Sequence, residues 1–246
     1  MQAKMKMKAQ ANKLVLSYLW WVLEPLLFVS LFYVLFEYLL QRGGEDFFTF
    51  LIVGKIVYLW FSKSVVTASM GLMQNRGIIA QRALPKWIFP LVNIQESTYK
   101  SIVSFILLML VLMLNGYYPH SGYWQLIPLL MLTYLLICGV GFVCALLVTL
   151  AQDFSNLIQL GMMGVMFGSG IFWDINSISN PENRDLIFTY NPMALLINDF
   201  RQVLMYDQSV DLTRYGFCLL VSVVLISFSL YVFKRFNNRV TRLLFS

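Results

Sequence analysis

The chain has 246 residues, of which 59% are hydrophobic, 16% are aromatic and only 12% are charged. A soluble domain carries about 25% charged residues, and at this length its interior could not bury so much apolar surface. The composition, with a net charge of +6, therefore excludes an ordinary soluble domain. It predicts an all-α integral membrane protein, because a helix satisfies its own backbone hydrogen bonds in lipid.

Six apolar segments are each long enough to cross a bilayer, which takes about 20 residues. The stretch from Lys100 to Asp153 has no charged residue between its ends, and the turn-forming residues 115–119 divide it into two spans. We expect one transmembrane domain with spans near residues 14–40, 47–70, 94–114, 124–150, 154–173 and 215–233. A basic segment, 1–13, precedes the first span, and an outer loop, 174–214, precedes the last.

Basic residues gather on one side of the predicted spans. They flank both ends of the chain and fill the connection between the second and third spans. The positive-inside rule therefore predicts that both termini are cytoplasmic. These residues are Lys4, Lys6, Lys8, Lys13, Arg76, Arg82, Lys86, Lys100, Lys234, Arg235, Arg239 and Arg242.

The sequence contains no pattern for catalysis or nucleotide binding. The Gly54-Lys55 pair lacks the upstream glycine of a phosphate-binding loop and lies inside an apolar span. His120 is the only histidine, and we expect it to be solvated at an outer turn. We therefore predict no catalytic residue, metal site or cofactor in this chain, and any ATP-driven step requires another polypeptide.

Four segments occur in a recognisable order. They are residues 16–26 (LSYLWWVLEPL), 81–90 (QRALPKWIFP), 138–141 (CGVG) and 190–196 (YNPMALL), the last followed by Phe200-Arg201. Together with six spans, this order resembles the permease subunits of type-2 ABC exporters, in the branch that exports O-antigen, capsule and teichoic acid polymers. The resemblance covers about residues 14–233.

The resemblance implies a homodimer in the bacterial inner membrane that works with two ATPase subunits, which bind ATP and Mg²⁺. Its substrate would be a lipid-linked polysaccharide, and nucleic acid is not expected as a partner. The ATPase would dock on the connection between the second and third spans, and a short outer helix would form a lid at the exit. The predicted coupling residues are Gln81, Arg82, Ala83, Leu84, Pro85 and Lys86.

Charged and aromatic side chains in the first two spans are candidates for the pathway. A lysine in the hydrocarbon core is costly, which favours an interior or water-filled setting. The alternatives are snorkelling for Lys63, a carbonyl partner for Lys55, pairing with a basic residue for Glu24, and packing or an interfacial belt for the aromatic residues. Related permeases usually have an apolar residue where this chain has Lys55, so its role is not implied by the resemblance. The pathway candidates are Trp20, Trp21, Glu24, Phe28, Phe32, Tyr33, Lys55, Tyr58 and Trp60.

Residues 193–205 are predicted to form a short apolar helix in the outer loop. Asn191 is a good N-cap and Pro192 suits the first helical position. Because the helix carries Asp199 and Arg201, we expect it to be re-entrant or to lie on the surface, and we assign Asn191, Pro192, Asp199 and Arg201 to an exit gate. In the fifth span, a GxxxG pattern at Gly164–Gly168 predicts close helix contact within the subunit or across the dimer.

O-antigen is the substrate we expect first, and capsular polysaccharide is the close alternative. A drug or small-lipid exporter of the same fold is a further alternative. A secondary transporter would carry paired acidic residues at mid-membrane, and this chain shows none there beyond Glu24 and Glu37.

Overall fold

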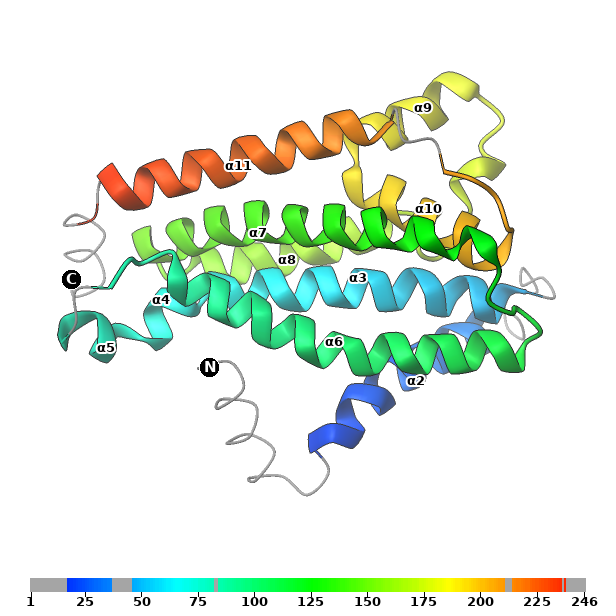
Figure 1. Cartoon of the computed structure of the whole chain (residues 1–246), viewed down its shortest axis with the longest axis horizontal. Helices are drawn as coiled ribbons and strands as arrows, with labels where there is room; N and C mark the ends of the chain where they lie inside the picture. Colours follow the sequence, from blue (N-terminus) through cyan, green and yellow to red (C-terminus); the bar gives the residue numbers. More distant parts are fainter. Residues whose placement is uncertain (1–16, 37–45, 82–83, 211–213, 236, 238–246) are drawn as a thin grey trace.

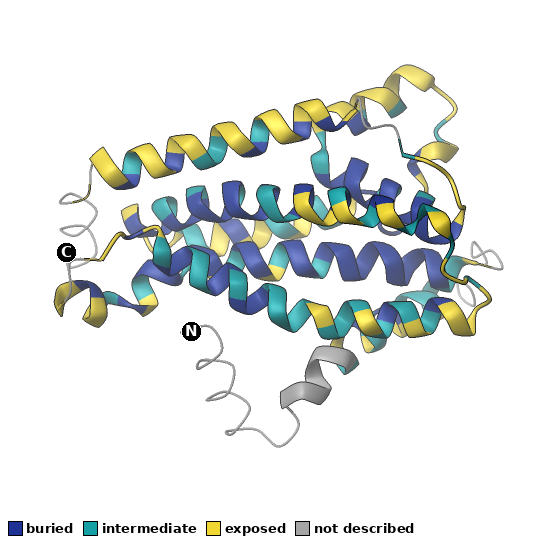
Figure 2. Cartoon of the chain, viewed as in Figure 1, coloured by how far each residue is buried: buried dark blue, intermediate teal, exposed yellow. Residues whose placement is uncertain are grey.

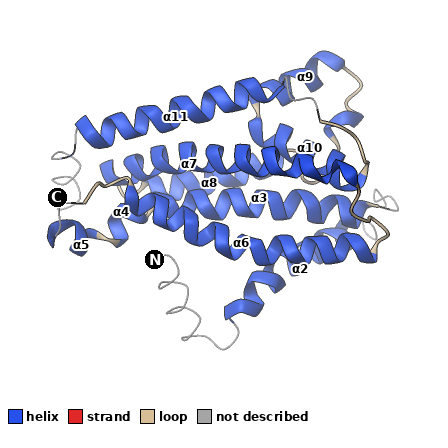
Figure 3. Cartoon of the chain, in the orientation of Figure 1, coloured by secondary structure: helices blue, strands red, loops and turns tan. Residues whose placement is uncertain are grey.

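A computed structural model describes residues 17–36, 46–81, 84–210, 214–235 and 237. Every regular element in these ranges is helical, and they contain no strand (Figure 3). Long helices run roughly side by side, while short helices gather at the two ends of the bundle (Figure 1). The predicted all-α class is confirmed.

The helices in chain order have the following bounds. They are α2 (Ser17–Val34), α3 (Phe47–Ser69), α4 (Gly71–Gln74), α5 (Arg76–Gln81), α6 (Ile88–Leu114), η2 (Ser121–Gln125), α7 (Leu126–Leu150), α8 (Phe154–Gly168), η3 (Ile175–Ser177), α9 (Pro181–Tyr190), α10 (Pro192–Met205) and α11 (Tyr215–Arg235).

Four helical segments of the described chain are long and apolar enough to cross a bilayer: α3, α6, η2 with α7, and α11. Two shorter apolar helices, Leu23–Val34 within α2 and all of α8, lie where the first and fifth spans are predicted. The chain is therefore a multi-pass membrane protein, and the count of six spans stays a prediction. Residues 1–16 and 37–45, which include the basic segment and both ends of the first predicted span, lie outside the described residues.

Two helix bounds differ from those predicted. Helix α6 begins at Ile88, earlier than the expected start near residue 94, because Pro90 lies in its first turn, where a missing N–H is tolerated. Helix α8 ends at Gly168, before the expected end near residue 173. Gly170, with a φ of 68°, then takes a left-handed conformation that suits glycine.

Helix α3 is the centre of the bundle. It packs against α2, α6, α7, α8 and α10, and it is buried along most of its length (Figure 2). Helix α11 packs on α7 and leaves most of its apolar surface exposed, which suits a helix that faces lipid.

The two glycines of the CGVG motif, Gly139 and Gly141, allow α7 to pack closely against its neighbours. A Cβ on Gly139 would lie 3.1 Å from the Ser222 carbonyl oxygen on α11, and a Cβ on Gly141 would lie 3.1 Å from Ala68 Cβ on α3. The two glycines therefore let α7 approach a different neighbour on each side.

Candidate functional site

Aromatic rings from α2, and from Phe36 just after it, form a row beside α3. Phe28, Phe32 and Phe36 are spaced by four residues, so a helical backbone places them on one face. Phe172, which follows α8, joins the row: its ring centroid lies 4.4 Å from that of Phe32 and 6.4 Å from that of Phe36. We call Phe28, Phe32, Phe36 and Phe172 the aromatic row.

Lys55 lies at the Phe28 end of the aromatic row. Its ammonium is 3.2 Å from the centroid of the Phe28 ring and 5.5 Å from that of Tyr58, and Nζ donates to Met166 Sδ at 3.5 Å. The residue is only 5% exposed. Aromatic faces and a sulfur atom, rather than a backbone carbonyl, therefore surround this charge between α2, α3 and α8, and cation–π attraction offsets part of its desolvation.

The other aromatic candidates do not all lie in this region between α2, α3 and α8. Tyr58 is buried and donates to the Met162 carbonyl of α8 at 2.5 Å, which ties α3 to α8. The Trp60 indole donates to Thr98 Oγ1 of α6 at 3.2 Å, so it packs away from α2. Tyr33 meets Phe48 edge to face at 5.5 Å. The side chains of Trp20 and Trp21 lie outside the described residues.

Glu24 and Lys63 form an ion pair between α2 and α3. Both side chains are about half exposed, at 49% and 47%. Pairs this open contribute at most about 1 kcal/mol, so the contact orients α2 more than it stabilises the fold. Pro25 lies inside α2, which continues to Val34.

Arg201 anchors the outer helix α10 to the bundle. Its guanidinium donates to three backbone carbonyl oxygens, those of Phe50 at 3.2 Å, Gly170 at 2.7 Å and Ile171 at 3.1 Å. Its Cζ also lies 3.3 Å from the centroid of the Phe50 ring. A cation held by three buried acceptors is a fixed structural element, and it joins α10 to α3 and to the turn after α8.

The start of α10 is built as the sequence predicts. Asn191 Oδ1 accepts from the backbone N–H groups of Met193 and Ala194, both at 3.1 Å, and Pro192 occupies the first position. Asn191 Nδ2 also donates to the Gly168 carbonyl at 3.0 Å. Asp199 is buried and accepts from Asn198 at 3.1 Å. Helix α10 is thus packed into the protein's own helices.

Two functional details were missed in the sequence. Gly54-Lys55 is an incomplete nucleotide-binding pattern, yet a Cβ on Gly54 would collide with Arg201 Nη2. The signal was a lone glycine in an otherwise bulky apolar span. Helix α9 is also absent from the sequence prediction, although Asn180-Pro181 repeats the cap signal of Asn191-Pro192. In the structure, Asn180 Oδ1 accepts from the Glu182 backbone N–H at 2.9 Å.

The expectation that His120 is simply solvated is wrong. Its Nε2 lies 3.0 Å from the Val203 carbonyl oxygen, and its Nδ1 lies 2.7 Å from Asp207 Oδ1. The ring therefore connects the segment before η2 to the end of α10.

The predicted coupling residues divide into an exposed and a buried part. Gln81, Leu84 and Pro85 are exposed, whereas Arg82 and Ala83 lie outside the described residues. Lys86 is buried, donates to Asn237 Oδ1 at 2.6 Å and also binds the Asn237 carbonyl. Burial lowers the pKa of the Lys86 ammonium. Leu84 is therefore exposed at the surface of this segment, whereas Lys86 is buried.

The α2–α3–α8 region presents stacked aromatic rings, one enclosed ammonium and two methionines. Nothing in this group provides a nucleophile with a base beside it. Aromatic faces suit contact with the apolar faces of sugar rings, and the ammonium suits an anion. Fold and site together define a multi-pass, all-α membrane protein with an aromatic, cationic helix face.

No protein-family model matches the chain. Comparison with individual known proteins does find relatives, and they are polysaccharide export permeases. An O-antigen export system permease protein, RfbA, of Klebsiella pneumoniae is 24% identical over 239 residues, which cover 97% of this chain and 91% of that protein. RfbA of Myxococcus xanthus is 22% identical over 223 residues, 90% and 85% of the two chains. The polysialic acid transport protein KpsM of Escherichia coli is 24% identical over 204 residues, 81% and 78%. The resemblance to type-2 ABC exporter permeases of the polysaccharide branch is confirmed.

Proposed function

We propose that this chain is the membrane permease of an ATP-driven exporter that moves a lipid-linked polysaccharide, O-antigen first, across the inner membrane. The observation that carries this proposal is similarity to an O-antigen export permease over 97% of the chain. The aromatic row beside Lys55 supports it, because stacked rings and a cation suit a glycan attached to a lipid pyrophosphate.

We propose that two copies of the chain surround a shared pathway, with both termini cytoplasmic and one ATPase subunit on the cytoplasmic side of each copy. The ATPase subunits bind ATP and Mg²⁺. Each docks on the exposed part of the connection between α5 and α6, at Gln81, Leu84 and Pro85. The six predicted spans form one domain, and α10 covers the outer end of the pathway.

The test is complementation of a bacterial strain that lacks its own O-antigen permease. We expect this chain, expressed with its ATPase, to restore O-antigen on the cell surface, and we expect undecaprenyl-linked polymer to accumulate inside when the ATPase is inactivated. Purified without the ATPase, the chain should hydrolyse no ATP. Hydrolysis by the isolated chain, or surface polymer that forms without the ATPase, would contradict the proposal.

Capsular polysaccharide is the second candidate, supported by the similarity to a polysialic acid transport protein over 81% of the chain. Complementation of a capsule-permease mutant in parallel separates the two substrates. A drug or small-lipid exporter predicts that neither strain is rescued while resistance to an apolar compound rises.

A further inference from the structure

A cavity of about 910 Å³ opens between α6, α7 and α11, at the end of the bundle where α11 finishes. Its wall is apolar and includes Cys138 and Phe142 of α7 and Leu230 and Phe233 of α11. We call it the α6–α7–α11 groove. None of the residues of the aromatic row lines it, but it shares Leu84 and Pro85 with the segment proposed to dock the ATPase.

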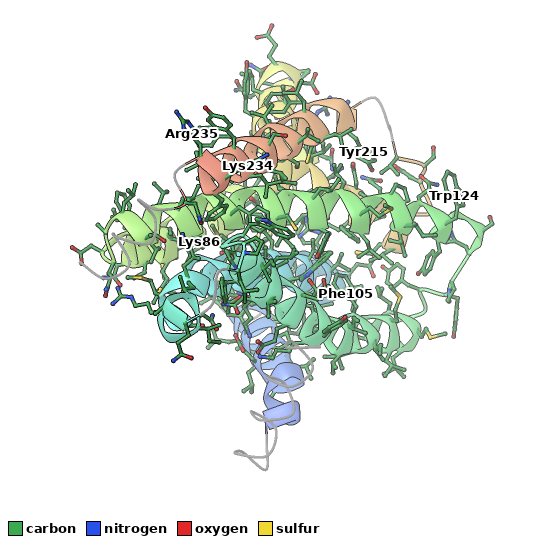
Figure 4. The ribbon with its side chains drawn as sticks, turned by 60° about the vertical axis from the view of Figure 1, so that its left-hand side comes forward. Lys86, Phe105, Trp124, Tyr215, Lys234 and Arg235 are labelled. Carbon is green, nitrogen blue, oxygen red and sulfur yellow. The ribbon has the colours of Figure 1, made fainter. Side chains whose placement is uncertain are left out.

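The mouth of the groove is basic. Lys86 enters from the segment before α6 and Lys234 from the last turn of α11, and Figure 4 shows both at the same end of the bundle. No acidic residue is among the described residues that line the groove. The sequence also has no Asp or Glu in residues 47–95 or 215–246, and Glu96, further along α6, pairs with Lys100.

Lys86 is held in position before any ligand arrives. Its contacts with Asn237 fix the ammonium at the wall, and a fixed cation loses less conformational entropy on binding than a mobile one. The two oxygen atoms of Asn237 are neutral acceptors, and burial lowers the pKa of Lys86. An anion at the mouth would favour the charged form of Lys86 and would offset this desolvation.

The apolar wall indicates what kind of anion would fit. Helices α6 and α11 are two of the candidate spans and expose apolar side chains, so both helices that border the groove have surfaces suited to acyl chains. A soluble anion would leave this wall uncovered. Basic pockets between membrane helices are known to take lipid headgroups.

We propose that the α6–α7–α11 groove binds an anionic glycerophospholipid of the bilayer, with its phosphate at Lys86 and Lys234 and an acyl chain along Phe142, Leu230 and Phe233. Lipid binding is measured without transport, so a failure of this proposal is distinguishable from a failure of the proposed export function.

The experiment is native mass spectrometry of the purified full chain after exchange into mixed micelles that contain phosphatidylglycerol and phosphatidylcholine at equal concentration. We expect phosphatidylglycerol to be retained in preference. Replacing one lysine, in Lys86→Gln or Lys234→Gln, should lower its retention about fivefold, since a basic residue near a lipid headgroup contributes on the order of 1 kcal/mol. Arg235→Gln is the matched control: it removes the same charge from the adjacent residue, which does not line the groove, and should change retention little.

Because Lys86→Gln also removes a buried contact, a second variant keeps the charges and fills the wall. Leu230 is 36% exposed, so Leu230→Trp should fold normally while it displaces the lipid. Equal retention of the two phospholipids, equal losses in Lys234→Gln and Arg235→Gln, or full retention in Leu230→Trp would overturn the proposal. Preferential retention of added undecaprenyl phosphate over phosphatidylglycerol would overturn it too and would assign the groove to the carrier lipid.

Discussion

Arg201 crosses α3 at Gly54, the only glycine of that helix. Three carbonyl acceptors hold its guanidinium, so the side chain cannot move aside without losing buried hydrogen bonds. We expect Gly54→Ala to lower the free energy of unfolding by about 1–3 kcal/mol, as overpacking of a core does. Thermal unfolding in detergent measures this. Gly216→Ala in α11 is the control, because a Cβ there meets nothing within 4 Å; equal melting temperatures for both variants would contradict the prediction.

Lys55 allows the pathway role to be separated from packing. Lys55→Met should keep the melting temperature unchanged or raise it, because it removes a buried charge and keeps the side chain's length. If the ammonium contacts an anionic substrate, export should fall about tenfold or more, since hydrogen bonds to charged groups contribute about 1.5–3 kcal/mol. Export is measured as surface polymer, and Lys55→Arg should retain most of it. Normal export by Lys55→Met would assign Lys55 to packing alone.

At the scale of elements, the connection between α5 and α6 has an exposed part, where we propose that the ATPase docks, and a buried part at Lys86. Leu84 is 38% exposed, so Leu84→Asp should weaken recovery of the ATPase in a pull-down about tenfold while the permease melts normally. Leu114→Asp is the control, as an exposed leucine at the opposite end of α6. Wild-type recovery with Leu84→Asp would place the docking site elsewhere.

Lys86→Glu should lower the melting temperature of the permease, because it sets a carboxylate against the two acceptor oxygens of Asn237.

The proposed outer position of α10 predicts which introduced cysteines react with a reagent added outside the cell. In a background that lacks Cys138, Cys144 and Cys218, Gln208→Cys should react with an impermeant maleimide added outside intact cells, because residue 208 is exposed beyond the end of α10. Asn198→Cys should react more slowly, since residue 198 is half-buried and bonded to Asn176. Arg235→Cys, at the opposite end of the bundle, should react only in opened cells. The reverse pattern would invert the proposed topology.

At the scale of the whole molecule, α8 presents an unpartnered apolar face within the described chain. Leu157, Leu160 and Met163 are each more than half exposed, and a Cβ on Gly161 or Gly164 would meet nothing within 4 Å. In a bilayer, small residues at such a face allow two helices to approach closely, which is why we predict that α8 contacts the second copy in the proposed dimer.

Cysteine cross-linking tests this contact. Gly164→Cys should form a disulfide-linked dimer in membranes under mild oxidation, whereas Val224→Cys, on the lipid-facing side of α11 and 55% exposed, should stay monomeric. Cross-linking of Val224→Cys without Gly164→Cys would move the interface from α8 to α11.

The sequence alone was sufficient for the features that depend on local composition and spacing. Apolar runs without charge predicted the membrane class and most helix bounds, because a backbone in lipid has no alternative to the helix. Asn191-Pro192 predicted the start of α10, because both the cap and the proline act within one turn. The four ordered motifs were sufficient to predict the family resemblance.

Only the tertiary structure decided which side chains meet. Arg201 and Gly54, Lys86 and Asn237, and Lys55 and Met166 are each separated by more than a hundred residues in the chain, and their pairing depends on how α3, α8, α10 and α11 pack. The same packing turns Trp60 toward α6, away from the α2 aromatic rings, and buries Lys86 in a loop that its charge would place in solvent. Periodicity and composition act over a few residues along one helix, whereas these contacts arise between helices whose relative positions no local pattern encodes.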